Sequence, residues 1–391
     1  MTRILPPAAL AVVALLGLVG CAAASPSPTA ESSSRAPSTA APASPTVTPT
    51  PVDPIADLSL EQRVGQLFMV GTSVGGPDPI TLEAVSQQHV GGIFLHGRSS
   101  AGVEAAAAFV KTFEDAHLES VPPLWIATDQ EGGDVQVLSG PGFDSMPTAL
   151  TQARSDTATL ETDATRWGAQ LAQAGVNMNL APVADIVTSA EAGPQNPPIG
   201  ALNREYGFDR ATVADKAGAF AAGMRTSGVM PTLKHFPGLG RATQNTDTRS
   251  GVVDDVVGAD SADVAVYGDL LAEGPAVVMM STAVYARIDP AAPAAFSPTV
   301  VTGLLREQLG FEGVVTTDDL SAAAQIRDWA PGDRALLSIE AGVDLVLVSA
   351  DPTVFPEMYA AVLSRAQTDD AFAAKVDAAA RRVVEAKASL G

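Results

Sequence analysis

The sequence predicts an α/β fold, a single-domain (β/α)8 barrel of the TIM type. Two observations predict it. From Ser59 onward, short apolar runs suited to buried parallel strands alternate with alanine-rich stretches suited to amphipathic helices. Eight such runs occur, each followed by a polar loop or one with glycine or proline, at residues 66–70, 92–95, 124–128, 176–180, 230–234, 276–280, 313–317 and 345–348. Eight strand–helix units in one stretch of chain favour a closed barrel.

Helix signals agree with this order of elements. Ser59 and Gln62 stand at capping-box spacing ahead of the first predicted strand, which predicts a helix start there. Residues 299–309 carry apolar side chains at helical spacing, and residues 376–390 predict a closing helix. No change of composition and no repeat of fixed period divides the rest of the chain, so residues 55–391 are predicted to form one barrel domain.

The N-terminus has the pattern of an exported lipoprotein. Its apolar stretch, residues 8–19, is too short to span a bilayer, which is typical of a signal peptide. The stretch ends in Leu18-Val19-Gly20-Cys21, which resembles a bacterial lipobox, whose cysteine is diacylated and becomes the new N-terminus. We therefore expect residues 1–20 to be a lipoprotein signal peptide and two acyl chains on Cys21 to anchor the protein at the extracellular face of the cell membrane. The alternative is an ordinary secretory signal.

Composition sets further limits. Residues 21–54 are dominated by Ser, Thr, Ala and Pro and predict a disordered linker, because such a segment cannot offset the entropy cost of ordering. The formal net charge of −21 argues against a nucleic-acid partner. The chain has no glycine-rich phosphate loop of the Walker type, and its few histidines and lone cysteine argue against a tightly held transition metal. The sequence thus predicts no metal and no cofactor.

Polar clusters follow four of the predicted strands, at the end of the barrel that carries the active site in this fold. They are the run Asp129-Gln130-Glu131-Gly132-Gly133, Asp185, the pair Lys234-His235 and the pair Asp318-Asp319. Carboxylates around a Lys-His pair, with no cluster of metal ligands, suit transfer at an acetal carbon through an oxocarbenium-like transition state. Taken singly, each carboxylate could equally cap a helix or bind loop backbone.

Five segments of the domain carry motifs of mixed chemistry, namely residues 129–133, 177–185, 203–207, 233–238 and 304–321. The fourth reads Leu233-Lys234-His235-Phe236-Pro237-Gly238, and the last contains Thr317-Asp318-Asp319. Together and in this order they resemble the signature segments of the β-N-acetylglucosaminidase branch of glycoside hydrolase family 3. The resemblance covers nearly the whole domain.

The resemblance implies roles for individual residues. By it, Asp318 is the nucleophile that forms a glycosyl-enzyme intermediate. Asp129, Arg204, Lys234 and His235 resemble the residues that hold the hydroxyls of the terminal sugar. The implied activity is retaining exo-hydrolysis of terminal non-reducing β-N-acetylglucosamine residues from peptidoglycan fragments, so the expected substrates are N-acetylglucosamine-containing muropeptides. Another exo-β-glycosidase of the same family, such as a β-glucosidase, is the enzymatic alternative.

The chain departs from this pattern at the expected general acid/base. In the resembled branch that group is a histidine within an Asp-Ser-His motif, whereas here the motif reads Asp247-Thr248-Arg249. An arginine stays protonated, so it cannot give a proton to the leaving oxygen and take one back from water. Three hypotheses remain open. Asp247 itself serves as acid/base, Arg249 binds an anion such as phosphate and the reaction is a phosphorolysis, or the protein is a noncatalytic muropeptide-binding lipoprotein.

Overall fold

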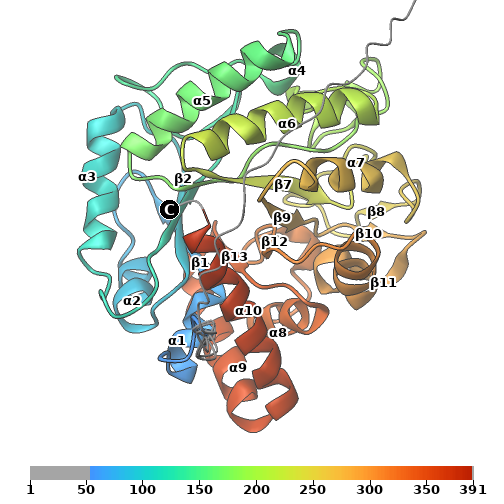
Figure 1. Cartoon of the computed structure of the whole chain (residues 1–391). Coiled ribbons are helices and arrows are strands. Elements are labelled where there is room, and N and C mark those ends of the chain that lie inside the picture. The colour runs from blue at the N-terminus through green and yellow to red at the C-terminus, as the bar shows by residue number, and fades with distance from the viewer. Residues whose placement is uncertain (1–52, 390–391) are drawn as a thin grey trace, which may run out of the picture. The chain divides into compact units, whose positions relative to one another are not determined.

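The computed structural model describes residues 53–389 of the chain. The predicted signal peptide, the lipidation site Cys21 and the predicted linker as far as residue 52 lie outside the described residues, and they stay predictions. In the described part, helices surround a central ring of strands (Figure 1).

Eight parallel strands form the ring, one at each place where the sequence predicts a strand. They follow the order β12-β9-β7-β6-β3-β2-β1-β13. A parallel bridge joins Thr316 to Leu345, and the Thr317 amide donates to the Leu345 carbonyl at 3.1 Å, so the two edge strands meet. The strands are β1 (Phe68–Ser73), β2 (Gly92–His96), β3 (Trp125–Thr128), β6 (Met178–Asn179), β7 (Met230–Phe236), β9 (Val277–Met280), β12 (Val315–Thr317) and β13 (Val346–Val348). The predicted (β/α)8 barrel is confirmed.

Side chains along the strands alternate between two apolar cores. Met69 of β1 belongs to a cluster with Phe94, Trp125 and Met279 of other strands, whereas its neighbours Phe68 and Val70 belong to the larger core that includes the helices. Both faces of each strand are therefore buried, which explains why the sequence shows continuous apolar runs and not apolar–polar alternation. Full burial of one large apolar side chain stabilises the folded state by about 1.5–3 kcal/mol relative to leaving it exposed.

The helices follow the strands and cover the outside of the ring (Figure 1). The predicted capping box is present, because the Gln62 amide donates to Ser59 Oγ and the Ser59 amide donates to Gln62 Oε1. The α-helices are α1 (Leu60–Gln66), α2 (Pro79–Gln87), α3 (Val103–Glu114), α4 (Ala149–Gln152), α5 (Thr157–Gln173), α6 (Arg210–Thr226), α7 (Ala262–Leu271), α8 (Pro331–Ala341), α9 (Phe355–Thr368) and α10 (Asp370–Ala388). None of these helices is long and apolar enough to cross a membrane, a finding that covers residues 53–389.

The predicted helix at residues 299–309 is present, but it is a π-helix, η4 (Thr299–Gln308). Its wider turn is visible where the Leu309 amide donates to the carbonyl of Leu304, five residues earlier, at 3.1 Å. The helix buries Val300, Val301, Leu304 and Leu305. Short 3₁₀ turns complete the helical elements, at η1 (Gly193–Gln195), η2 (Gly200–Leu202), η3 (Ala294–Phe296), η5 (Ala324–Ile326) and η6 (Pro352–Val354).

The N-terminal ends of the strands are closed by α1 and α10. Arg63 of α1 pairs with Asp377 of α10 at 3.1 Å, and Lys387 of α10 donates to Gln66 of α1 at 2.7 Å. Asp53, the first described residue, forms an ion pair with Arg381 of the same helix. The chain therefore enters and leaves the barrel side by side at this end.

Two groups of short strands follow the C-terminal ends of the ring strands, at the opposite end of the barrel. After β3, a hairpin of β4 (Gln130–Gly132) and β5 (Val135–Gln136) follows directly. A second small sheet joins β8 (Val253–Asp254), β10 (Val284–Tyr285) and β11 (Asp289–Pro293).

Candidate active site

A pocket of about 410 Å³ opens at the C-terminal ends of the strands. This volume is within the usual range for small-molecule sites, about 300–1,000 Å³. Its floor is the last layer of the barrel core, with Phe94, Met279 and Leu347. The pocket brings together all six residues that the sequence predicts for catalysis and sugar binding, namely Asp129, Arg204, Lys234, His235, Asp247 and Asp318.

The side chain of Asn179 fixes the loop that carries Asp129. Asn179 of β6 accepts from the Gln130 amide at 3.0 Å and donates to the Gln130 carbonyl at 3.1 Å. These two bonds replace strand pairing and turn the chain into the β4–β5 hairpin. Gly132 is required there, because its φ is +107° and an added Cβ would lie 2.1 Å from the Pro147 carbonyl oxygen. The motif of residues 129–133 is thus explained by backbone geometry as well as by chemistry.

Two cations and two carboxylates form one network along a wall of the pocket. Lys234 Nζ lies 2.7 Å from Asp129 Oδ1 and 2.6 Å from Glu131 Oε1. Arg204 clamps Glu131 in a bidentate pair, with bonds of 2.8 and 2.7 Å. Lys234 and Glu131 are both only 3% exposed. The network holds Lys234, Arg204 and Asp129 in fixed positions toward a ligand.

Glu131 is the residue of this network that sequence reasoning left without a role. Its burial alone would raise the pKa of the carboxyl group, but Arg204 and then Lys234 outweigh burial and lower the pKa to about 2. Glu131 therefore stays ionised and compensates two buried cations. The only sequence signal for it was its place in the Asp-Gln-Glu-Gly-Gly run.

His235 is held by a buried carboxylate. Its Nδ1 lies 2.7 Å from Asp185 Oδ2, and the fully buried Asp185 side chain also accepts from the Leu239 amide at 2.6 Å. With Nδ1 engaged, Nε2 is the ring nitrogen left for a ligand in the pocket. Asp185, which the sequence marked only as a polar group after the fourth strand, thus orients a pocket residue.

The two neighbouring aspartates after β12 have different surroundings. Asp319 accepts from the amides of Ser321, Ala322 and Ser349 at 2.9–3.0 Å and from Ser321 Oγ at 2.6 Å. Within residues 53–389, Asp318 accepts only from the Asp319 amide, at 2.8 Å, and it is half-buried at the pocket. Asp319 therefore holds the loop, while Asp318 keeps carboxylate oxygen lone pairs available to a ligand.

Asp247 lies at the mouth of the same pocket, on the loop after β7. Asp247 is exposed, yet desolvation by the surrounding protein and then the charge of Asp318 raise the pKa of Asp247 to about 6. His235 and Arg204 oppose this shift. The charge of Asp318 therefore acts on the ionisation of Asp247 within one pocket.

Arg249 does not line this pocket. It is exposed and lines a separate hollow beside it, together with Thr248 and Arg327. An anion held by Arg249 in this position would not share the pocket with Asp318.

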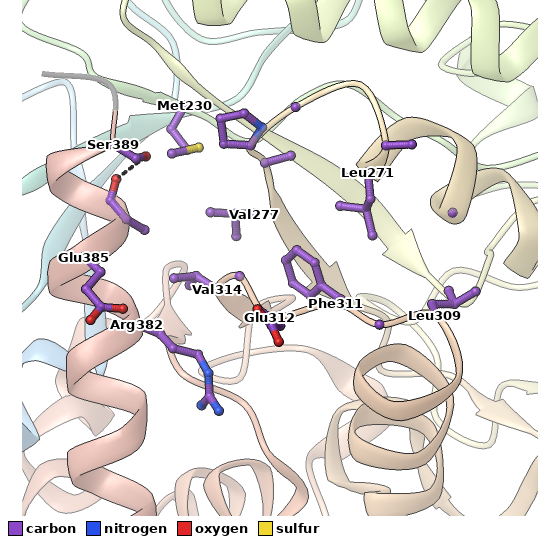
Figure 2. Close-up of a pocket in the computed structure, with 18 residues that line it drawn as sticks. Met230, Leu271, Val277, Leu309, Phe311, Glu312, Val314, Arg382, Glu385 and Ser389 are labelled. Carbon is purple, nitrogen blue, oxygen red and sulfur yellow. Dashed lines mark hydrogen bonds between the residues drawn. The ribbon is translucent and has the colours of Figure 1, made fainter.

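The hollow in Figure 2, of about 600 Å³, lies at the other end of the barrel, between α7, η4 and α10. Met230 and Val277, which begin β7 and β9, line it together with Phe311. None of the six predicted residues lines this hollow, and its walls are mainly apolar. Within residues 53–389, no three His, Cys, Asp or Glu side chains gather into a metal site. The chemistry of the described domain is therefore concentrated at the C-terminal mouth.

Comparisons with known proteins agree with this geometry. The model of the glycosyl hydrolase family 3 N terminal domain matches residues 59–386. The chain is 32% identical over 330 residues to the β-hexosaminidase LpqI of Mycobacterium tuberculosis, covering 79% of each chain, and 32% identical over 269 residues to a β-hexosaminidase of Vibrio cholerae, covering 68% of this chain and 77% of that protein.

Solved structures give the same result. The crystal structure of β-N-acetylhexosaminidase from Beutenbergia cavernae is 60% identical in sequence, with a TM-score of 0.84, and the match covers 85% of this chain and 99% of that one. A family 3 β-N-acetylglucosaminidase from Paenibacillus is 29% identical, with a TM-score of 0.75, over 85% of this chain and 62% of that one. The barrel, its polar mouth and these matches together lead to one conclusion: the chain belongs to glycosyl hydrolase family 3 and is a glycosidase.

Proposed function

We propose that this glycosidase removes terminal non-reducing β-N-acetylglucosamine residues by hydrolysis with retention of configuration. The observation that carries the proposal is the pair of carboxyl groups in one pocket, Asp318 with free oxygens and Asp247 with its pKa raised to about 6. Retaining glycosidases need one carboxylate that attacks and one carboxyl group that gives and takes a proton. The β-hexosaminidases among the relatives support the choice of sugar.

In the first step, Asp318 attacks the anomeric carbon while the bond from that carbon to the leaving oxygen breaks. Asp247 in its acid form transfers its proton to that oxygen, so the aglycone leaves as an alcohol. The result is a covalent ester between the sugar and Asp318. The role of Asp247 is supported by its pKa, since a proton donor works best with a pKa near the working pH.

In the second step, water attacks the anomeric carbon and Asp247, now a carboxylate, takes its proton. The ester bond to Asp318 breaks, and the sugar leaves with its original configuration. Formation of the ester removes the negative charge of Asp318, which is one cause of the raised pKa of Asp247. The pKa of Asp247 therefore falls once the ester has formed, so Asp247 is more fully ionised at the moment when a base is needed.

Sugar binding is assigned to Asp129, Arg204, Lys234 and His235. Charged donors and acceptors give short, directional bonds to hydroxyl groups and fix the ring for attack. Their fixed positions in the ion-pair network and on Asp185 support this assignment. Hydrolysis is favoured over phosphorolysis because Arg249 lines a different hollow from Asp318.

The cellular setting is also proposed. We infer that the protein is exported and held at the extracellular face of the membrane by acyl chains on Cys21, and that its substrates are muropeptides from peptidoglycan. One relative, 30% identical over 305 residues, is named an uncharacterized secreted glycosyl hydrolase from Arthroderma benhamiae. Incorporation of labelled fatty acid into the protein, absent after Cys21→Ser, tests the anchor.

The decisive experiment is turnover of an activated aryl β-N-acetylglucosaminide by the mature chain in mild detergent. We expect turnover that is lost in Asp318→Asn, because that variant has no nucleophile. Faster cleavage of the matching β-glucoside would instead assign a β-glucosidase. Binding of the sugar without turnover above that of the variant, in folded protein, would assign a noncatalytic muropeptide-binding lipoprotein.

A further inference from the structure

A second hollow, of about 620 Å³, lies directly beside the catalytic pocket. Its lining is polar and includes Gln244, Asn245, Thr248, Arg249 and Arg327. These residues come from the loop after β7 and from the segment around η5. The hollow is large enough for a sugar-sized group.

Only a thin wall separates the two spaces. Consecutive residues face opposite sides of it, since Asp247 and Ala323 line the catalytic pocket while Thr248 and Ala324 line the second hollow. The wall is held by backbone bonds from the Ala324 amide to the Asp247 carbonyl at 3.1 Å and from the Gln325 amide to the Thr246 carbonyl at 3.0 Å. A ligand that passes over Asp247 therefore leaves one space and enters the other.

Hydrogen bonds of the Gln325 side chain also stabilise the wall. The Gln325 side chain is buried and accepts from the Val252 amide at 2.8 Å, and it donates to the Val252 carbonyl at 3.1 Å. These two bonds join the η5 segment to the chain just beyond Arg249. The positions of Arg249 and Arg327 relative to Asp247 are thus set by a hydrogen-bonded frame.

The charge of this hollow is unusual for the molecule. The chain carries 44 acidic and 23 basic residues, and other arginines near the mouth are paired with carboxylates, as Arg204 is with Glu131 and Arg241 with Asp263. Arg249 and Arg327 have no hydrogen bond or ion pair of their guanidinium groups within residues 53–389, and both are exposed. Two unpaired guanidinium groups on one polar wall suit an anion, and the planar fork matches a carboxylate.

We propose that this hollow is the aglycone site of the enzyme and that Arg249 and Arg327 recognise a carboxylate on the leaving sugar. The inference rests on the proposed function, because it needs Asp247 beside the leaving oxygen. The aglycone then begins at the wall and continues into the hollow. The preferred substrates are β-N-acetylglucosaminides whose aglycone carries a carboxylate, as a muramic acid residue does in its lactyl group.

The test compares two disaccharides that differ only in this charge. One is N-acetylglucosaminyl-β-1,4-N-acetylmuramic acid, and the other is its lactyl methyl amide. We expect the wild-type enzyme to cleave the acid with the higher kcat/KM, and the advantage to shrink as salt screens the exposed charges. In the double variant Arg249→Gln with Arg327→Gln, kcat/KM for the acid falls by about tenfold, toward the value for the amide.

Matched controls separate this role from general damage. Turnover of a neutral aryl β-N-acetylglucosaminide should stay within about twofold of wild type in the double variant, since no carboxylate is present. Arg154→Gln, which changes an exposed arginine that lines neither space, should leave both disaccharides unaffected.

Several outcomes would overturn the proposal. Equal kcat/KM for acid and amide in the wild type would do so, as would an unchanged preference in the double variant. Stimulation by inorganic phosphate with release of a sugar 1-phosphate, lost in the double variant, would assign the arginines to an acceptor phosphate. Failure of the proposed function is a different result, because then the aryl glycoside is not cleaved by the wild type. Calorimetric binding of acid and amide to both proteins would still test the arginines.

Discussion

Replacement of Asp247 by asparagine is the sharpest test of the catalytic scheme, since the sequence lacks the expected histidine. A carboxyl group with a pKa of about 6 is protonated in roughly one molecule in ten at pH 7. With the ordinary value of 3.8, about one molecule in 1,600 would be protonated at that pH. The surroundings of Asp247 thus raise the supply of proton donor by roughly a hundredfold.

The size of the effect follows from the leaving group. General acid/base help is worth about 10²–10⁴ in rate, so Asp247→Asn should lower kcat/KM by that factor for a disaccharide, whose leaving sugar needs a proton. An activated aryl glycoside needs little acid help, so its kcat/KM should fall far less. Its kcat should still fall, because the second step lacks a base. Azide, which attacks without giving up a proton, should restore that kcat.

The pH profile gives an independent readout. The acid form of Asp247 is the active one in the first step, so kcat/KM of the wild type should fall about tenfold per pH unit above pH 6, whereas Asp247→Asn should be flat there. Asp328→Asn, an exposed change that lines neither space at the mouth, serves as control. Disaccharide hydrolysis by Asp247→Asn at the wild-type rate would refute the assignment.

Other predictions concern the nucleophile and the fold. Asp318→Asn should lower aryl glycoside turnover by roughly four orders of magnitude or more, and mass spectrometry of the wild type with a slow fluorinated substrate should locate the trapped sugar on the peptide with Asp318. Glu131→Gln should lower the free energy of unfolding in urea by about 3–5 kcal/mol, because it removes the carboxylate that pairs with Arg204 and leaves the buried Lys234 with Asp129 alone. Since the folded-state pKa of Glu131 is depressed to about 2, its contribution is complete above about pH 4.5 and is lost as pH falls toward 2, a slope that the variant should lack. Phe220→Ala should cost about 3–5 kcal/mol in the same assay, because Phe220 is fully buried, and an unchanged midpoint would contradict the packing described for α6.

The barrel was predictable because each strand can be recognised from its own residues, without knowledge of its neighbours in the sheet. Both faces of each strand are buried, so each appears as an apolar run whatever its partners are. The type of the helix at Thr299–Gln308 was not predictable in this way. Its buried residues Val300, Val301, Leu304 and Leu305 fit one face of an α-helix as well as a π-helix over so short a length.

The sequence predicted which residues form the site, but not which of them pair with one another. Motif positions identified six residues that meet in one pocket. The sequence does not reveal that Glu131 joins Arg204, 73 positions away, to Lys234, because such pairing depends on the closed ring. Nor does it reveal that Thr248 and Arg249 turn away from Asp247 into a second space, which is set by hydrogen bonds to the η5 segment.

The ion pair between Asp53 and α10 determines at which end of the barrel the N-terminal segment joins the domain. Asp53 pairs with Arg381 at the end of the barrel where α1 and α10 cover the first residues of the strands, and the catalytic mouth is at the other end. An attachment made through the N-terminus, such as the one predicted at Cys21, joins the domain at the end of the barrel that α1 and α10 close. The point where such an attachment joins the domain and the entry to the pocket are then at opposite ends of the barrel, so a substrate reaches Asp318 from the end that does not carry the attachment.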